Sequence, residues 1–370
     1  MIPLILAFFS LLFIPYWDGP NVVTSKLLFV AFLLILVETP TKLNFELPQY
    51  LFLAWLAWAA ICCFSSDHVQ LAVNGFHLRL EGLITYVLLA TYAVYYWWIF
   101  RNISALRWFL AVALVIIPLL YMFLPQRTFQ IVVMTEIAMA AMASLGAVLL
   151  WGLTPSTILI ALLAIVLSAN RTACVSMFSG IVVYFILQKM RFKREIILIV
   201  LVIACILPFT QLARRFSDIN FETLGTGART QWLVQAFKLS QDRPILGYGL
   251  DTLSLYLKPA TGPTQEAAVL TDKVHNIAFD IILQTGYPGF LLAFACLVSA
   301  IFITYKHRTE QNIACLAVVI AWLAFGMLNP HGILGHLVMI VSLFGIKRTS
   351  TKHAINSYYP DLDPPQPILR

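Results

Sequence analysis

Three residues have the types and positions needed to bind and transfer a charged group: Arg171, Arg229 and His275. Arg171 lies in LSANRTACV, between two apolar runs that leave almost no room for a loop. Arg229 follows two glycines at the start of a predicted helix, where free amides and the helix dipole favour an anion. A guanidinium group presents a planar fork of donors that matches phosphate oxygens. His275 precedes another predicted helix and is a candidate general base near neutral pH.

Each of these residues also has a plainer interpretation. Arg171 could be an anchor whose charged end reaches the lipid headgroups. Arg229 could be an ordinary surface arginine, and a single histidine such as His275 is more often structural than catalytic. The residue types alone leave both interpretations open.

The composition identifies the elements that must position these residues. The chain of 370 residues is 61% hydrophobic and 11% charged, whereas soluble domains have about 25% charged residues. Many apolar runs approach the roughly 20 residues that a membrane-spanning helix needs. We therefore predict an all-α integral membrane protein with about twelve transmembrane helices. The runs centre on 2–16, 26–38, 50–64, 83–100, 106–124, 131–151, 155–169, 172–188, 195–212, 288–305, 312–328 and 333–346.

One hydrophilic segment, residues 213–275, interrupts this pattern. Within it, ARTQWLVQAFKLS at 228–240 places Trp232, Leu233, Ala236 and Phe237 at helical spacing, which predicts an amphipathic helix along the membrane surface. The segment DRPILGYGLDT that follows is rich in turn residues. Residues 275–286 are predicted to form a short re-entrant or interfacial helix that ends before the next span.

These features divide the chain into four regions. Residues 1–212 hold helices 1–9, residues 213–287 form a periplasmic loop with the catalytic elements, residues 288–352 hold helices 10–12, and residues 353–370 form a cytoplasmic tail. The orientation follows from the excess of Lys and Arg in cytoplasmic loops. The predicted inner loops contain Lys42, Arg101, Arg107, Lys189, Arg191, Lys193, Arg194, Lys306, Arg308, Lys347, Arg348 and Lys352, and the short outer loops contain only Lys26, Arg79, Arg127 and Arg171. The long loop is therefore predicted on the outer face.

Other polar residues give weaker signals. Arg79 and Glu81 precede a span and either pair with each other or reach the same outer cavity. The basic and acidic residues of the long loop form either a solvated, salt-bridged surface or a site for a lipid phosphate. Glu136 lies inside a span and has no assigned role, and His77, His331 and His336 are weaker candidates for contact with a metal or a substrate. The six cysteines lie in apolar runs, so neither disulfides nor a cysteine metal site is expected.

The order of several short motifs resembles a known family. The arginine of SANRT is followed by R-x-x-W (Arg229 and Trp232), then by P-x-x-G-x-G, and finally by H-N with a later G-x-x-G. The chain resembles the superfamily of O-antigen ligases and polymerases over about residues 165–305 by motif, and over its whole length by topology. The remaining motif residues are Pro244, Gly247, Gly249, His275, Asn276, Gly286 and Gly289.

The resemblance implies an enzyme in the bacterial inner membrane with its active site on the periplasmic face. Such enzymes transfer a glycan from undecaprenyl pyrophosphate to an acceptor, without nucleotide, metal or another cofactor. Carried over to this chain, Arg171 and Arg229 would hold the pyrophosphate and His275 would be the general base. Expected substrate-binding residues are Arg79, Trp232, Arg243, Gly247, Gly249 and Asn276. The expected partners are the lipid-linked donor, a lipid A–core or glycan acceptor and membrane lipids, but not nucleic acid.

Several activities remain open at this level. A ligase would transfer finished polymer to lipid A–core, a polymerase would extend lipid-linked polymer, and a protein O-oligosaccharyltransferase would modify a protein. The single outer loop of moderate size favours a ligase. A flippase of lipid-linked glycan is the main alternative of another class, although the charges gather at the outer face rather than deep in several spans. A peptidoglycan polymerase would need a catalytic Asp in the loop, for which Asp218, Asp242, Asp251 and Asp272 are available, but the His275–Asn276 pair argues against it.

Overall fold

A computed structural model describes much of the long hydrophilic loop and six of the predicted apolar helices. The described residues are 31, 33–35, 44–75, 81–100, 171–188, 226–258, 260–261, 268–269, 273–327 and 333–348. They are almost entirely helical, apart from a two-residue antiparallel pair of strands, β1 (Ala260–Thr261) and β2 (Ala268–Val269). The other elements are α3 (Leu47–Phe64), α4 (Val69–Asn74), α5 (Leu83–Ile99), α9 (Arg171–Gln188), α12 (Thr226–Asp242), the 3-10 turn η3 (Leu253–Leu255), α13 (Ile277–Lys306), α14 (Glu310–Gly326) and α15 (Ile333–Gly345).

The predicted apolar runs at 50–64, 83–100, 172–188, 288–305, 312–328 and 333–346 are confirmed as helices. Two helices, α3 and α13, are long and apolar enough to cross a membrane, and α5, α9, α14 and α15 are shorter apolar helices. The other predicted runs lie wholly or mostly outside the described residues, so a total of about twelve spans stays a prediction.

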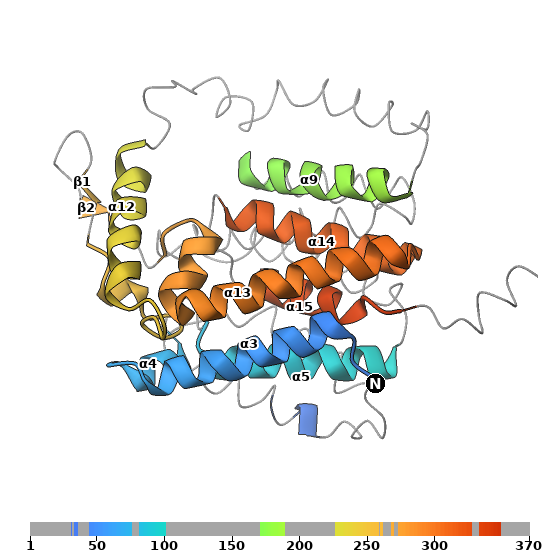
Figure 1. Cartoon of the computed structure of the whole chain (residues 1–370), viewed down its shortest axis with the longest axis horizontal. Coiled ribbons are helices and arrows are strands. Elements are labelled where there is room, and N and C mark those ends of the chain that lie inside the picture. The colour runs from blue at the N-terminus through green and yellow to red at the C-terminus, as the bar shows by residue number, and fades with distance from the viewer. Residues whose placement is uncertain are drawn as a thin grey trace, which may run out of the picture.

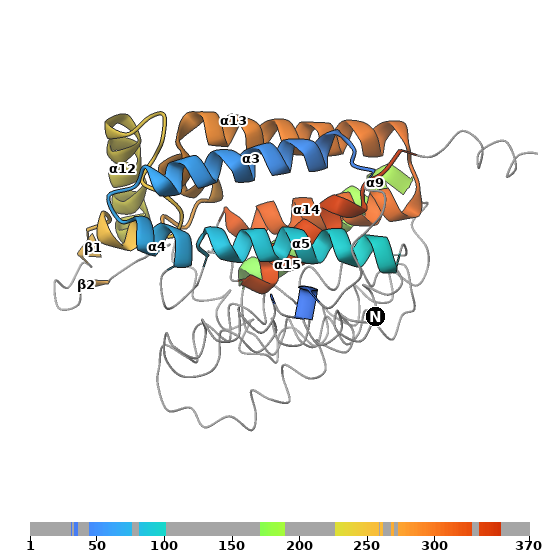
Figure 2. The ribbon, with the colours of Figure 1, turned by 90° about the horizontal axis from the view of Figure 1, so that it is seen from below.

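The apolar helices form a bundle of two layers. α3 and α13 lie side by side on one side of α5, α14 and α15, and α9 packs on α14 (Figures 1 and 2). α12 stands across one end of this bundle, next to β1 (Figure 1). If the bundle helices cross the bilayer, α12 therefore lies along the membrane surface, as the sequence of α12 predicted.

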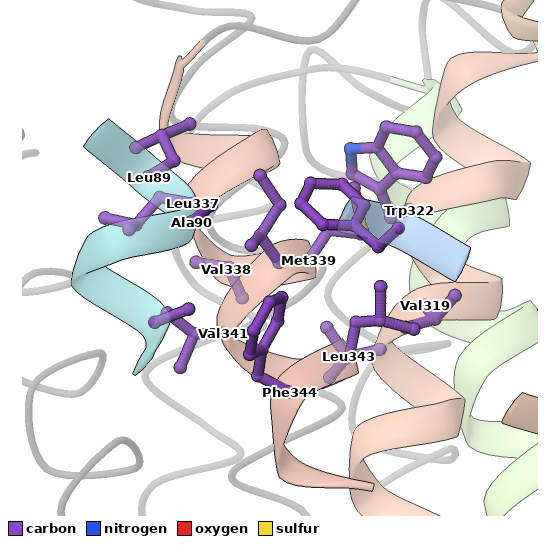
Figure 3. Close-up of a cluster of buried hydrophobic side chains, with 14 of the residues drawn as sticks. Leu89, Ala90, Val319, Trp322, Leu337, Val338, Met339, Val341, Leu343 and Phe344 are labelled. Carbon is purple, nitrogen blue, oxygen red and sulfur yellow. The ribbon is translucent and has the colours of Figure 1, made fainter. Parts of the chain in front are cut away.

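The core between α5, α14 and α15 is made of interdigitating aliphatic and aromatic side chains. Figure 3 shows Leu89 and Ala90 of α5 and Trp322 of α14 around the buried face of α15. Polar contacts also join neighbouring helices. For example, Trp97 Nε1 of α5 donates to the backbone O of Val341 at 2.6 Å, and Ser176 Oγ of α9 donates to that of Ala321 of α14 at 2.6 Å. Each buried donor is satisfied by the neighbouring helix, which favours one register between the two helices.

The kink in α13 separates a short helix, which carries Asp280 and Gln284, from a long apolar one. Gly286 has φ 68° and ψ 178°, and Pro288 follows two residues later. The first part of α13 begins at the N-cap Asn276, whose side chain accepts from the backbone N–H groups of Ala278 and Phe279. The predicted break before the span is thus confirmed. The helix begins at Ile277 rather than at His275.

Candidate functional site

The long loop has a small hydrophobic core of its own. Trp232 and Ala236 of α12 are buried in it, whereas Phe237, expected on the same face, is 54% exposed. The predicted helix is confirmed, but its buried residues are those at positions 232, 236 and 240, and not the whole predicted apolar face. The buried members of this loop core are Trp232, Ala236, Tyr248, Leu253, Leu257, Val274 and Leu283.

Hydrogen bonds dock the loop onto the kink of α13. Pro288 has no N–H, so the carbonyl of Gln284 lacks its helical donor, and the N–H of Gly249 supplies one at 3.1 Å. The N–H of Tyr248 similarly donates to the carbonyl of Leu283 at 2.7 Å. In return, the N–H of Tyr287 donates to the carbonyl of Pro244 at 2.8 Å. The P-x-x-G-x-G turn and the kink of α13 therefore satisfy each other's backbone hydrogen-bonding groups.

Two glycines make this close approach possible. Gly247 has φ +62°, and a Cβ there would lie 2.6 Å from the backbone oxygen of Leu283. Gly286 has φ +68°, and its Cβ would lie 1.9 Å from the backbone oxygen of Ile245. No side chain fits at either contact.

His275 lies where the loop core meets the start of α13. Its backbone is left-handed, with φ 61°, which is uncommon for a residue other than glycine. Its ring is stacked on that of Trp232, with centroids 5.4 Å apart and an interplanar angle of 12°. The half-buried imidazole is thus held in one orientation by a packed ring and by a constrained backbone.

A buried cluster of charges lies directly beside this segment. The Nζ of Lys273 is 2.8 Å from Oε2 of Glu81 and 3.6 Å from Oδ1 of Asp251, and all three side chains are at most 4% exposed. The second oxygen of Asp251 accepts from the backbone N–H of Glu81 at 3.0 Å. His336 of α15 brings its Nε2 to 3.5 Å from Oε2 of Glu81, and to 3.4 Å from the hydroxyl of Tyr86.

The carboxylates keep Lys273 charged in spite of its burial. Burial by itself lowers the pKa of Lys273, but Glu81, Asp251 and Asp280 more than offset this and raise its pKa well above the usual range. Asp280 also accepts from the backbone N–H of Val274 at 2.8 Å. The cluster therefore anchors both the side chain of residue 273 and the backbone that leads to His275.

Two cavities adjoin this cluster and differ in size and character. The polar one, lined by Glu81, Lys273, Asp280 and His336 among others, has a volume of about 30 Å³. That is room for about two water molecules and not for a sugar. The apolar one, between the two helix layers, has a volume of about 210 Å³. Its lining comes from α3, α5, α13, α14 and α15, for example Phe52, Phe290, Phe294, Trp322 and Met339.

The two cavities share part of their walls. Trp55, Tyr86, Ile277, Ile281 and His336 line both. The indole N–H of Trp55 is buried and has no hydrogen-bond partner among the described residues. A polar donor thus lies at the boundary between the apolar cavity and the charged one.

Several predicted substrate-binding residues make contacts within the fold. Arg243 forms an ion pair with Asp67, and its guanidinium lies 5.1 Å from the centre of the Tyr248 ring. The N–H groups of Gly247 and Gly249 are both bonded to backbone carbonyls, and Asn276 caps α13. Trp232 packs against His275. These residues shape the loop around the histidine.

Of the other predicted arginines, the structure describes only the backbone of Arg171 and Arg229, and it does not describe Arg79. Arg171 is the first residue of α9, whose early turns pack against the last turns of α14 through Ser176 and Ala321. Arg229 lies in the first turn of α12, as predicted, but its side chain is outside the described residues. Arg79 also lies outside them, so whether Arg79 pairs with Glu81 stays untested.

Sequence reasoning missed the core of the charged cluster. Lys273 was expected either on a solvated surface or at a lipid phosphate, and it is instead buried in an ion pair. Glu81 does reach a cavity, the small polar one, and His336 lines the same cavity. The sequence did not assign Asp251 or Asp280 to the charged cluster. One feature of the sequence could have indicated a buried partner for Asp280: it is the only carboxylate in the predicted helix at 275–286, which is otherwise mostly apolar.

Comparison with known proteins identifies the central part of the chain. Residues 156–294 match the family model described as O-antigen ligase. This segment includes Arg171, Arg229, the loop core and His275, so it covers the motifs on which the resemblance rested. No curated protein matches the sequence.

Proposed function

Residues 156–294 match the O-antigen ligase family, and from that match we propose that this chain is a ligase of the O-antigen ligase superfamily, acting at the periplasmic face of the inner membrane. It would transfer a glycan from undecaprenyl pyrophosphate to a hydroxyl of lipid A–core. The apolar helices and the family match support a membrane protein with a glycosyltransferase-type activity.

His275 would be the general base of this reaction. The acceptor hydroxyl gives its proton to the imidazole while its oxygen forms a bond to the anomeric carbon. The bond between that carbon and the phosphate oxygen breaks, undecaprenyl pyrophosphate leaves with the electron pair, and the anomeric configuration inverts. Arg171 and Arg229 would balance the charge that develops on the leaving group.

The observation that carries this proposal is the fixed orientation of His275. Its left-handed backbone and its stack on Trp232 hold the ring at the end of the loop, next to the N-terminus of α13. A base that is held in one orientation loses little freedom on reaching the transition state. Residues other than glycine in strained backbone conformations cluster at functional sites, which favours a functional role for His275.

The apolar cavity supports a substrate that carries a hydrocarbon chain. It is lined mainly by apolar and aromatic side chains and lies between helices that are apolar enough for the membrane. Its polar end, at Trp55 and His336, lies beside the charged cluster. An isoprenoid or acyl chain matches this lining, whereas a free sugar does not.

The decisive test is lipopolysaccharide analysis in a host that makes lipid-linked O-antigen but lacks its own ligase. We expect the parent chain to produce a polymer ladder attached to lipid A–core. His275→Asn should abolish the ladder while keeping the backbone, because asparagine tolerates a left-handed conformation. The matched control is His307→Ala, since His307 follows the other end of α13. A ladder with His275→Asn at parental level would refute the proposed role of His275.

The same host separates the alternatives. No ladder from the parent, with the protein present in the membrane, points to another acceptor or to a polymerase. Restored polymer length in a polymerase-deficient host would then identify the polymerase. A flippase would instead restore polymer in a host without its own flippase, and that activity would survive His275→Asn.

A further inference from the structure

We infer that Lys273 is a positioning residue for His275. Its buried ammonium anchors the segment 273–276 to the rest of the fold, so that His275 keeps its left-handed backbone against Trp232. This inference rests on the proposed function, because it assumes that the orientation of His275 matters for transfer.

Three consecutive residues point into three different surroundings. Lys273 enters the charged cluster, Val274 is buried in the loop core, and His275 stacks on Trp232. Because the three anchors are adjacent in sequence, the backbone between them has little freedom. A shift of Lys273 would therefore be transmitted to His275 over two peptide units.

The anchors of Lys273 come from separate elements of the fold. Glu81 lies two residues before the start of α5, and Asp251 lies in the loop after the glycine turn. Asp280 belongs to α13 and binds the backbone N–H of Val274. Asp251 is itself left-handed, with φ 55°, and its N–H donates to Oε1 of Gln284 at 3.1 Å. The ammonium thus ties the His275 segment to the bundle.

Lys273 cannot act by touching the glycan in this geometry. It is 3% exposed, and the cavity that it lines holds only about two water molecules. Its effect on transfer must pass through the residues that it holds in place. Loss of Lys273 should therefore lower kcat and leave the KM values for both substrates nearly unchanged.

The first experiment compares two lysines of the same loop. Purified full-length protein in detergent is assayed with undecaprenyl-pyrophosphate-linked O-antigen and lipid A–core. Lys273→Gln should lower kcat by about tenfold to a hundredfold, the loss expected when a catalytic group is misplaced. Lys258→Gln removes an exposed lysine and should change kcat by less than about twofold. An unchanged kcat for Lys273→Gln would overturn the inference.

The second experiment separates positioning from any other role of Lys273. His275→Gly removes the imidazole and keeps the left-handed backbone accessible. Imidazole added to the buffer should restore part of the activity, because it can occupy the vacated space beside Trp232. In that rescued background, Lys273→Gln should cost less than about twofold, since free imidazole is not held by the backbone. A further tenfold loss there would contradict a role through His275.

A pair of variants at Asp280 covers the cases in which Lys273→Gln does not fold or imidazole does not rescue. Asp280→Asn keeps an oxygen that can accept from the N–H of Val274, and it should keep kcat within about threefold. Asp280→Leu has a similar size but no acceptor, and it should lower kcat by about tenfold or more. Equal kcat values for the two variants would overturn the inference.

Failure of this inference can be told apart from failure of the proposed function. If His275→Asn still transfers glycan, His275 is not the base and the proposed function fails. If His275→Asn is inactive while Lys273→Gln keeps full kcat, only the positioning role of Lys273 is wrong.

Discussion

The indole Nε1 of Trp58 donates a hydrogen bond to the backbone oxygen of Thr285 at 2.8 Å. This bond joins α3 to α13 one residue before the kink at Gly286. The loop turn binds the same stretch through the carbonyls of Leu283 and Gln284. The kink is therefore held from two directions, by a bundle helix and by the loop, and the start of α13 that follows His275 is fixed with it.

Gly286→Ala should disrupt this arrangement. A Cβ at Gly286 would lie 1.9 Å from the backbone oxygen of Ile245, and the left-handed φ is unfavourable for alanine as well. We expect a loss of about 3 kcal/mol or more in unfolding free energy. Chymotrypsin should then cleave at Tyr248 or Tyr256, which are protected while the loop is docked.

Pro288→Ala is the matched comparison for that prediction. It returns an N–H to the helix but creates no clash, and the φ of Gly286 still breaks the helix. We expect a change of about 1 kcal/mol at most, with the loop still protected from chymotrypsin. Cleavage of Pro288→Ala as fast as that of Gly286→Ala would show that the kink depends on Pro288 as well as on the contact at Gly286.

Trp232 should contribute to both stability and transfer. Trp232→Ala removes a buried ring and should cost about 3–5 kcal/mol of stability. Trp232→Phe keeps an aromatic face for His275 and should retain most of the ladder in the ligase-deficient host. Phe237→Ala is the control on the same helix, because Phe237 is 54% exposed, and it should change stability by less than about 0.5 kcal/mol. A full ladder from a folded Trp232→Ala variant would show that the stack is unnecessary.

The sequence was enough to predict the elements but not their long-range partners. Apolar runs located α3, α5 and α14, because a buried helix needs a continuous apolar surface whatever its neighbours are. The break at Gly286 was also predictable, since glycine followed by proline interrupts helical hydrogen bonding.

The pairing of Glu81 with Lys273 was not predictable in the same way. No periodicity relates two charged residues that lie on elements far apart in the chain, and each resembles a surface residue when it is read alone. The glycine turn illustrates the same limit: Gly247 and Gly249 indicate a turn, but only the structure shows that the turn packs on a helix kink.

Filling the apolar cavity should weaken binding of a lipid-linked substrate. Ala293 lines this cavity, whereas Ala295, two residues along α13, does not. Ala293→Phe should raise the KM for undecaprenyl-pyrophosphate-linked O-antigen by about tenfold, because the added ring occupies space that a hydrocarbon chain would need. Ala295→Phe makes the same chemical change outside the cavity and should leave the KM within about twofold. Equal KM values for the two variants would show that the cavity does not bind this substrate.

The ion pair of Lys273 predicts how stability depends on pH. Because the pKa of Lys273 is raised in the fold, its contribution is fully present below the unfolded value of 10.5 and is lost only as pH rises through the higher folded value. Removing the ammonium leaves buried carboxylates without their cation, so Lys273→Gln should cost about 3–5 kcal/mol. The difference in Tm between the parent and Lys273→Gln should therefore not shrink between about pH 7 and about pH 9. A difference that shrinks steadily over this range would mean that Lys273 loses its proton there, and that the three carboxylates do not hold its charge.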